Sequence, residues 1–186
     1  MIEIKTVSCT DELKGILSLQ RENLKNLISN EEAVQQGFVT AEYSLELLQQ
    51  MHAESPSVIA KYGNKVVGYA LVTTQAIMPH HDLLSDFFRV IQQLQYNGFP
   101  VKNTSYVVIG QLCVAKNYRG MGLVQQLYSF FKETLKHRFD FCLTDVAQTN
   151  PRSLKAHIKT GFTVIDTLTY GDVSWDIVLW DWRADG

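Results

Sequence analysis

The stretch Ala115–Tyr128, "AKNYRGMGLVQQLY", decides the fold, because it passes from an apolar run to a helix through an arginine and two glycines. Before it, residues 104–115 ("TSYVVIGQLCVA") are typical of a buried strand. After it, residues 122–137 ("GLVQQLYSFFKETLKH") carry apolar side chains at helical spacing, and residues 139–147 ("FDFCLTDVA") are typical of another strand. This order of strand, helix and strand predicts two parallel strands joined by a right-handed crossover.

The two glycines of this stretch, Gly120 and Gly122, lie where the strand turns into the helix. A helix N-terminus carries unpaired N–H groups and a partial positive charge. Glycine lets a phosphate approach the backbone closely there, and Arg119 can add a charge-assisted contact. The alternative is a tight turn with a solvated arginine. The spacing lacks both Gly-Lys-Ser/Thr and a third glycine, which argues against a nucleoside triphosphate or nicotinamide site.

The rest of the chain predicts an α+β class with a mixed sheet. A strong hairpin signal, Gly63-Asn64, separates two β-rich runs, and a turn is expected at Gly171-Asp172. Asp11 is the expected cap of the first helix. The further elements expected are strands at 2–7, 162–170 and 173–182 and helices at 11–28, 41–52 and 151–160.

Length and composition point to one ordinary domain of 186 residues, 1–186. The formal net charge of -2 gives no field that would attract nucleic acid or an anionic membrane surface. Three cysteines, Cys9, Cys113 and Cys142, are odd in number and far apart, which fits a reducing compartment. No apolar stretch approaches the roughly 20 residues of a membrane span, and the first residues do not resemble a signal peptide. We therefore expect a cytoplasmic protein.

Two motifs resemble those of the GCN5-related N-acetyltransferase (GNAT) superfamily. "RGMGLV" is similar to the acetyl-coenzyme A signature: Arg119 and Gly122 match, whereas Val124 stands where the family prefers Gly or Ala. "NPRSLKAHIKTGF" is similar to a second family segment, with His157 in place of the usual tyrosine. The positions of this second segment that match are Asn150, Ser153, Lys159, Gly161 and Phe162. Its other reading is a capped helix that begins at Asn150 and stops at Gly161.

The resemblance implies α/β/α layers around a mixed, mostly antiparallel sheet of about seven strands, with a central pair of parallel, splayed strands. It also implies acetyl-CoA as cosubstrate, with the pantetheine arm between the splayed strands. The residues expected to contact the cofactor are Leu112, Cys113, Val114, Arg119, Gly120, Met121, Gly122, Leu123, Val124, Asn150, Ser153 and His157.

The resemblance further implies direct attack of an amine on the thioester near Gln111. His157 is then the expected acid for the departing thiolate, and its other reading is a half-buried histidine that only makes a hydrogen bond. Glutamine cannot accept a proton at working pH, so Asp145 is the candidate base; its other reading is a strand-end carboxylate bonded to backbone. Cys113 has no histidine nearby in sequence and reads as a core residue.

The segment at about 76–104 is an expected helical insertion between two strands. Connections of this length usually have a function. Its apolar stripe predicts packing on the body of the protein. Phe87, Phe88 and Tyr96 either wall the acceptor pocket, which Gln111 also borders, or form a homodimer interface. Adjacent histidines, His80 and His81, point apart, so no metal is expected.

The predicted function is N-acetyl transfer from acetyl-CoA to a primary amine of a small molecule, amino acid or peptide. One alternative is a catalytically weak, CoA-binding sensor or interaction module with the same fold. Another is a purely structural domain that uses the glycines as turns and does not bind CoA.

Overall fold

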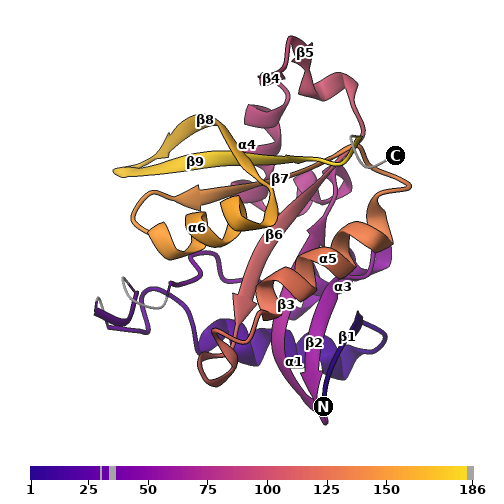
Figure 1. The fold of residues 1–186 in the computed structure, drawn as a ribbon, viewed down its shortest axis with the longest axis vertical. Helices are drawn as coiled ribbons and strands as arrows, with labels where there is room; N and C mark the ends of the chain where they lie inside the picture. The colour runs from indigo at the N-terminus through magenta and orange to yellow at the C-terminus, as the bar shows by residue number, and fades with distance from the viewer. Residues whose placement is uncertain (30, 34–36, 184–186) are drawn as a thin grey trace.

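The computed structural model describes residues 1–29, 31–33 and 37–183. A seven-stranded sheet in the order β1-β2-β3-β6-β7-β9-β8 forms the centre of the molecule. Figure 1 shows α5 and α6 in front of the sheet and α1, α3 and α4 behind it, which confirms the expected three layers. The strands of the large sheet are β1 (Ile2–Thr6), β2 (Val58–Tyr62), β3 (Lys65–Thr73), β6 (Tyr106–Val114), β7 (Phe141–Ala147), β8 (Thr163–Tyr170) and β9 (Val173–Asp181). The helices are α1 (Thr10–Arg21), α3 (Leu45–Glu54), α4 (Asp82–Ile91), α5 (Leu123–Leu135) and α6 (Pro151–Thr160).

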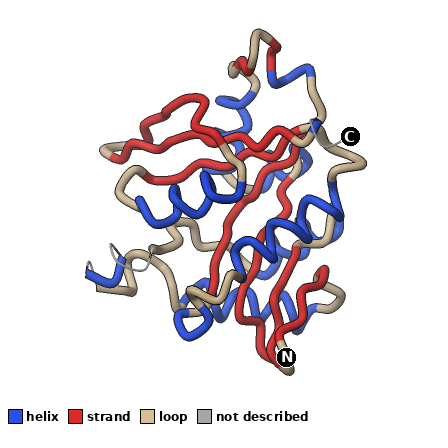
Figure 2. The backbone as a smooth tube through the Cα atoms, viewed as in Figure 1, coloured by secondary structure: helices blue, strands red, loops and turns tan. Residues whose placement is uncertain are grey.

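The strands β6 and β7 are the parallel pair that the strand–helix–strand order predicts, and the other pairs of the large sheet are antiparallel. Their pairing runs only from Tyr106↔Phe141 to Val108↔Leu143. Beyond Val108 the two strands diverge, as Figures 1 and 2 show. Opposite β3, Ala70 pairs with Leu112 and Val72 with Ile109, so β6 carries one extra residue at this point. The expected splayed pair is confirmed.

The first helix differs from its prediction at both ends. Cys9 is its N-cap, so the expected cap at Asp11 is wrong. The helix ends at Arg21 instead of continuing to residue 28. Leu24 fits the helical periodicity but lies outside the helix. It is buried where it forms an isolated parallel bridge with Val39. A contact between segments that are distant in the sequence therefore buries this side chain, and local periodicity cannot predict such a contact.

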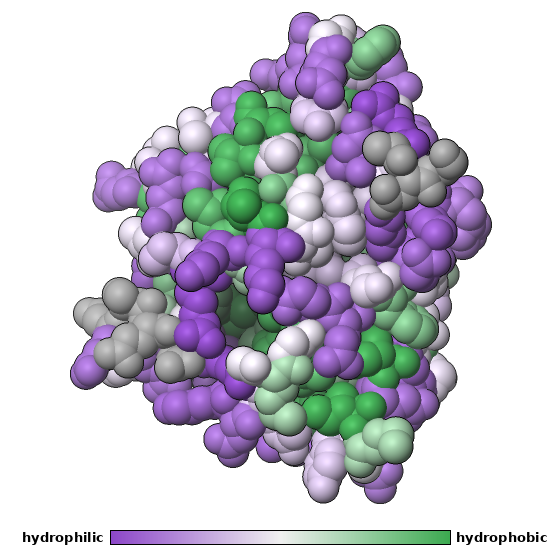
Figure 3. Space-filling view, in the orientation of Figure 1, coloured by the Kyte–Doolittle hydropathy of each residue, from purple (hydrophilic) through white to green (hydrophobic). Residues whose placement is uncertain are grey.

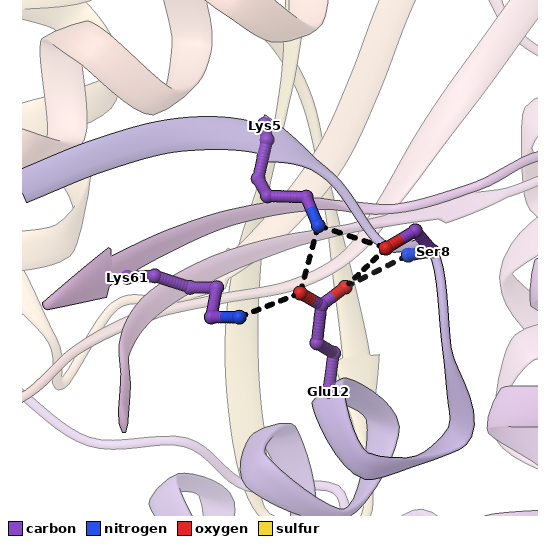
Figure 4. Close-up of polar contacts among 4 residues, drawn as sticks. All are labelled: Lys5, Ser8, Glu12 and Lys61. Atoms are coloured by element: carbon purple, nitrogen blue, oxygen red, sulfur yellow. Dashed lines mark hydrogen bonds and ion pairs between the residues drawn. The ribbon is translucent and has the colours of Figure 1, made fainter. Parts of the chain in front are cut away.

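Buried charge fixes the corner where β1 meets α1 (Figure 4). The carboxylate of Glu12 accepts hydrogen bonds from the ammonium groups of Lys5 and Lys61, each at 2.8 Å, and from the backbone N–H of Ser8 at 2.8 Å. Burial alone would raise the pKa of Glu12, but these three hydrogen bonds lower it to about 2. The cluster therefore ties α1 to β1 and β2 through an ionised carboxylate.

The segment between β3 and β6 packs against the sheet through a smaller hydrophobic core. It contains α4, the short hairpin of β4 (Gln95–Tyr96) and β5 (Phe99–Pro100), and the 3-10 turns η1 (Gln75–His80) and η2 (Val101–Asn103). The expected helix is confirmed, with the Nδ1 atom of His81 accepting a cap hydrogen bond from Leu84 N at 3.4 Å. The buried residues of this core are Phe87, Phe88, Ile91, Leu94, Val101, Tyr106, Val108, Phe141, Leu143, Ile177 and Leu179.

Candidate functional site

Two adjoining cavities lie where β6 and β7 diverge. The larger, which we call the outer groove, has a volume of about 380 Å³, and the smaller, which we call the inner cavity, about 100 Å³. Figure 3 shows a recess below α6 with an apolar floor and a hydrophilic rim. The outer groove is lined by Asn23, residues 37–39, 112–114, 118–120, 122–125, Asn150, Arg152, Ser153, Lys155, Ala156 and Lys159. The inner cavity is lined by residues 38–41, Tyr43, Leu83, Leu84, Phe87, residues 108–112, 144–147, Asn150, Ser153, His157 and Trp175.

The glycine loop at the start of α5 borders the outer groove. Gly120 has φ 78°, and Gly122, the N-cap of the helix, has φ 73°. Residues with a Cβ atom rarely adopt this left-handed backbone conformation. A Cβ at Gly120 would meet nothing within 4 Å. The first i to i-4 hydrogen bond runs from Gln126 N to Gly122 O at 3.1 Å, so the N–H groups before it have no partner within the helix. The loop thus combines free donors with open space.

Arg119 is partly committed to the protein itself. Its Nε donates to Val114 O at 2.9 Å, and its Nη2 donates to Asn23 Oδ1. Its Nη1 is buried and has no hydrogen-bond partner among the described residues. Burial lowers the pKa of Arg119. The guanidinium therefore braces the loop and keeps one unpaired donor beside the groove.

Positive charge dominates the outer groove. Arg152, Lys155 and Lys159 line it from α6, and Arg119 lines it from the glycine loop. None of its described lining residues is acidic. Arg152 and Lys155 were missed in the sequence, although the spacing 152, 155 and 159 places all three side chains on one helical face. The groove suits a polyanion.

Asn150 caps α6 and also binds the segment around Phe38. Its Oδ1 accepts from Ser153 N at 3.2 Å, which confirms the helix cap, and its Nδ2 donates to Phe38 O at 3.2 Å. Phe38, Val39, Leu112, Asn150 and Ser153 border both cavities. The segment around Phe38 therefore forms part of the boundary between the two.

His157 borders the inner cavity but is only 3% exposed. Its Nδ1 lies 2.7 Å from Ser153 O, and its Nε2 lies 2.6 Å from the Tyr128 hydroxyl. Because a carbonyl can only accept, Nδ1 carries the proton and Nε2 accepts from Tyr128. Burial lowers the pKa of His157 to about 4, and the Ser153 carbonyl opposes this shift. In this arrangement the imidazole is neutral, and both ring nitrogens are occupied by protein groups.

Gln111 connects three parts of the fold through buried hydrogen bonds. Its Oε1 accepts from Gln20 Nε2 at 3.0 Å and from the Tyr69 hydroxyl at 2.6 Å, while its Nε2 donates to Ala41 O at 2.8 Å. Gln20 Oε1 in turn accepts from Tyr43 N at 3.0 Å. The glutamine thereby fixes the segment 41–43 as a wall of the inner cavity. A carboxylate at this position could not donate to the Ala41 carbonyl.

Asp145 contributes the only carboxylate among the described lining residues of the inner cavity. Burial raises the pKa of Asp145 to about 6, and its own backbone amide opposes the shift. Among the described residues, no side chain donates a hydrogen bond to this carboxylate. With this pKa the carboxylate is ionised at neutral pH, and the described lining of the cavity contains no lysine or arginine beside it.

Most of the residues expected to contact the cofactor line the outer groove. All the expected cofactor-contact residues except Met121 and His157 border the outer groove. Met121 is 57% exposed on the loop. Burial raises the pKa of Cys113 to about 12, despite the opposing charge of Arg119, so its thiol stays protonated and unreactive at neutral pH.

The three aromatic residues expected at the acceptor pocket have different positions. Phe87 borders the inner cavity beside Leu83 and Leu84. Phe88 and Tyr96 line neither cavity: Phe88 is fully buried near Tyr106, and the Tyr96 ring lies 5.6 Å from that of Phe141. The next position along a helix turns by about 100°, which directs Phe88 into the core. Phe87 and Phe88 are covered by the chain's own sheet and offer no exposed ring to a dimer partner.

The described part of the chain contains neither a cluster of metal-binding side chains nor a helix that could span a membrane. No group of three or more His, Cys, Asp or Glu side chains there could hold a metal ion. Within the same ranges, no helix has the length and apolar character needed to cross a bilayer.

Known proteins share this fold at low sequence identity. The NatC complex bound to Gag peptide and CoA matches with a TM-score of 0.66 and 14% identity, over 97% of this chain and 98% of that one. A ribosomal-protein-alanine N-acetyltransferase from Brucella melitensis matches with a TM-score of 0.63 and 16% identity, over 96% and 99%. A Salmonella typhimurium protein solved with its cofactor acetyl-CoA matches with a TM-score of 0.61 and 15% identity, over 97% and 93%. No curated protein matches in sequence. The sequence profile of the acetyltransferase (GNAT) family matches residues 22–162. The chain therefore belongs to the acetyltransferase (GNAT) family.

Proposed function

We propose that the protein is an N-acetyltransferase that uses acetyl-CoA to acetylate a primary amine. One observation carries this proposal: a cationic groove and a cavity with a single unpaired carboxylate adjoin where two parallel strands diverge. Relatives of the same fold are described as N-acetyltransferases or were solved with CoA or acetyl-CoA.

The charge of the outer groove suits coenzyme A. The free N–H groups before Gln126 and the unpaired Nη1 of Arg119 would bind the pyrophosphate, and the α6 cations would bind phosphate groups. Val124 replaces a smaller residue of the family motif, yet its backbone N–H lies in the first turn of α5 and stays available. The pantetheine arm would follow β6 beyond Val108, where the strand has no partner on the β7 side.

Asp145 is our proposed general base. Acetyl-CoA supplies an activated acyl group, and the amine must lose a proton before or during attack. A carboxylate whose pKa burial raises to about 6 is a stronger base than an exposed aspartate, and it is still ionised at pH 7. The inner cavity places this carboxylate beside the groove that would hold the thioester.

The departing thiolate needs an acid with a proton that it can donate. His157 would have to break its hydrogen bond with Ser153 or with Tyr128 before it could donate to a ligand. We therefore propose that water in the open groove supplies this proton and that His157 holds α6 against α5. The role of acid for His157, expected from the motif, is the alternative that mutation can test.

A pair of glycine variants tests the cofactor site. Gly122→Glu places a carboxylate against the proposed pyrophosphate site, whereas Gly63→Glu makes the same change in the β2–β3 turn, at φ 58°. A Cβ at Gly63 would meet nothing within 4 Å, and one at Gly122 would meet only Gln126 Nε2 at 3.9 Å. At 100 times its dissociation constant, acetyl-CoA should stabilise the wild type and Gly63→Glu by about 2.7 kcal/mol and Gly122→Glu much less. Equal thermal shifts in both variants would remove the loop from the site.

Measurement of thiol release in the presence of primary amines separates an enzyme from a CoA-binding module. Our proposal expects amine-dependent release of CoA together with an acetylated amine detected by mass spectrometry. Saturable binding of acetyl-CoA without any acetylated amine would favour the module.

A further inference from the structure

The lining of the inner cavity limits which amine can bind there. Its charge comes from the Asp145 carboxylate, because the described lining contains no lysine or arginine and its one histidine, His157, is neutral. The aromatic members of the wall are Phe38, Tyr43, Phe87 and Trp175. A carboxylate within an apolar wall favours an ammonium group on an apolar body.

A second polar group of the cavity wall has no partner. The Nε1–H of Trp175 is buried, and no described residue accepts its hydrogen bond. Trp175 pairs with Ala147, and Asp145 pairs with Ile177, on the neighbouring strands β7 and β9. Directly paired residues share a face of the sheet, as do residues two apart, so Asp145 and Trp175 are diagonal neighbours on one face, with Cα atoms roughly 7–8 Å apart. A buried donor without a partner is costly, so this N–H suits an acceptor atom on the ligand.

We propose that the acceptor is an α-amino amide with an apolar side chain, such as the first residue of a peptide. This inference rests on the proposed function and specifies its substrate. The ammonium group pairs with Asp145, and the adjacent neutral carbonyl accepts from Trp175 Nε1. A volume of about 100 Å³ holds roughly seven to ten water-sized groups, which is the size of one small residue.

The same lining disfavours two other classes of amine. A free amino acid would bring its carboxylate close to Asp145, and no cation of the described lining would compensate for the second negative charge. A polyamine would place its second ammonium group against aromatic and aliphatic walls without a carboxylate. Both would leave the Trp175 donor or a ligand charge poorly satisfied.

Three probes with the same side chain test this proposal: leucinamide, 3-methylbutylamine and free leucine. They carry a neutral carbonyl, no carbonyl or a carboxylate beside the amine. An α-amino group has a pKa of about 8 and an alkylamine about 10.4, so kcat/KM is compared per concentration of unprotonated amine. We expect kcat/KM for leucinamide to exceed that for 3-methylbutylamine by about fivefold, the effect of one neutral hydrogen bond. We expect free leucine to be at least about 100-fold poorer than leucinamide, because like charges would be buried together.

Two tryptophan variants provide the matched comparison. Trp175→Phe keeps an aromatic wall but removes the donor, so the ratio of kcat/KM for leucinamide to kcat/KM for 3-methylbutylamine should fall to about one. Trp182 also has a buried Nε1 without a partner among the described residues, but it lines neither cavity. Trp182→Phe should therefore leave the preference unchanged. The ratio of the two rates is insensitive to the folded fraction of either variant.

The outcomes separate this inference from the proposed function. Acetylation of free leucine as fast as leucinamide, or an unchanged preference in Trp175→Phe, would overturn the inference and leave the acetyltransferase standing. Saturable acetyl-CoA binding with no acetylation of leucinamide or 3-methylbutylamine would also overturn it. If acetyl-CoA does not bind at all, the proposed function fails and the inference fails with it.

Discussion

The outer groove and the inner cavity share a wall but have opposite charge. The groove is lined by Arg119, Arg152, Lys155 and Lys159. Among the described lining of the cavity, Asp145 is the only charged residue, because His157 is neutral. The groove is also built mainly from two local motifs, a glycine loop and a capped helix. The cavity is assembled from segments that lie far apart in the chain. The charge of the groove therefore suits a polyanion, and the charge of the cavity suits a cation.

The largest effect is expected when the carboxylate of the cavity is neutralised. Asp145→Asn should lower kcat/KM for a primary amine by roughly 100- to 10,000-fold, because it removes both the base and the charge that pairs with the ammonium group. Acetyl-CoA affinity should change little. Asp166→Asn, on the exposed strand β8, is the matched control and should leave both values unchanged.

The pH dependence of the rate provides a second test of Asp145 as the base. Burial raises the pKa of Asp145 to about 6, so the wild-type rate should fall as pH drops below about 6 and the base becomes protonated. The residual activity of Asp145→Asn should lack this step. Full activity of the variant, or an unchanged acidic limb, would assign the base to another group.

The contrast between the two cavities also explains what the sequence could predict. "RGMGLV" and the capped helix after Asn150 are local motifs, and the family resemblance assigned Gly120, Gly122 and Ser153 to one site. All three line the outer groove. The parallel β6–β7 pair follows from the order of elements and the handedness of crossovers. These parts could be predicted because each depends on residues that lie close together in the sequence.

The inner cavity was predicted far less completely. Asp145 was suspected from its strand, but Phe38, Tyr43 and Trp175 reach the cavity through non-local packing that periodicity does not encode. Phe88 and Tyr96 were expected either at the acceptor pocket or in a dimer interface. Phe88 lies in the smaller hydrophobic core, and Tyr96 packs against it. Burial also changes chemistry: a histidine with an ordinary pKa near 6.5 is held neutral at position 157 by its surroundings.

A smaller effect should follow from reversing one charge of the outer groove. Lys155→Glu, on exposed α6, should weaken acetyl-CoA binding about tenfold, which corresponds to roughly 1.4 kcal/mol. The effect should shrink as salt is raised, because exposed charges are screened. Lys102→Glu makes the same net change outside the groove and should have no effect on calorimetric affinity. Equal effects in both variants would mean that net charge, and not the groove, attracts the cofactor.

At the inner cavity, His157→Phe should change the single-turnover rate by less than about threefold if water is the acid. It should instead lower stability by about 1–3 kcal/mol, because it leaves the buried Tyr128 hydroxyl without its partner. Tyr128→Phe should have a similar cost, and the double variant should lose less than the sum. A loss of roughly 100-fold or more in His157→Phe alone, with Tyr128→Phe near wild type, would establish His157 as the acid.

The corner around Glu12 belongs to neither cavity, and its alteration should affect neither ligand (Figure 4). Glu12→Gln removes the carboxylate that Lys5 and Lys61 share, and we expect a loss of about 2 kcal/mol in the free energy of unfolding at pH 7. The pKa of Glu12 is lowered to about 2 from an ordinary 4.5, so its stabilising contribution is complete above pH 4.5 and is lost as pH falls towards 2. The difference between wild type and variant should therefore shrink across that window in denaturant titrations.

The control for Glu12 is Asp11→Asn on the same helical turn. Asp11 forms an exposed ion pair with Lys14 at 3.2 Å, with side chains that are 89% and 60% exposed, and its loss should change stability by no more than about 0.5 kcal/mol. Kinetic constants for both substrates should match the wild type in both variants, since neither residue lines a cavity. A change in acceptor KM on Glu12→Gln would mean that α1 transmits strain through Gln20 to Gln111, and the two cavities could no longer be treated as independent of this corner.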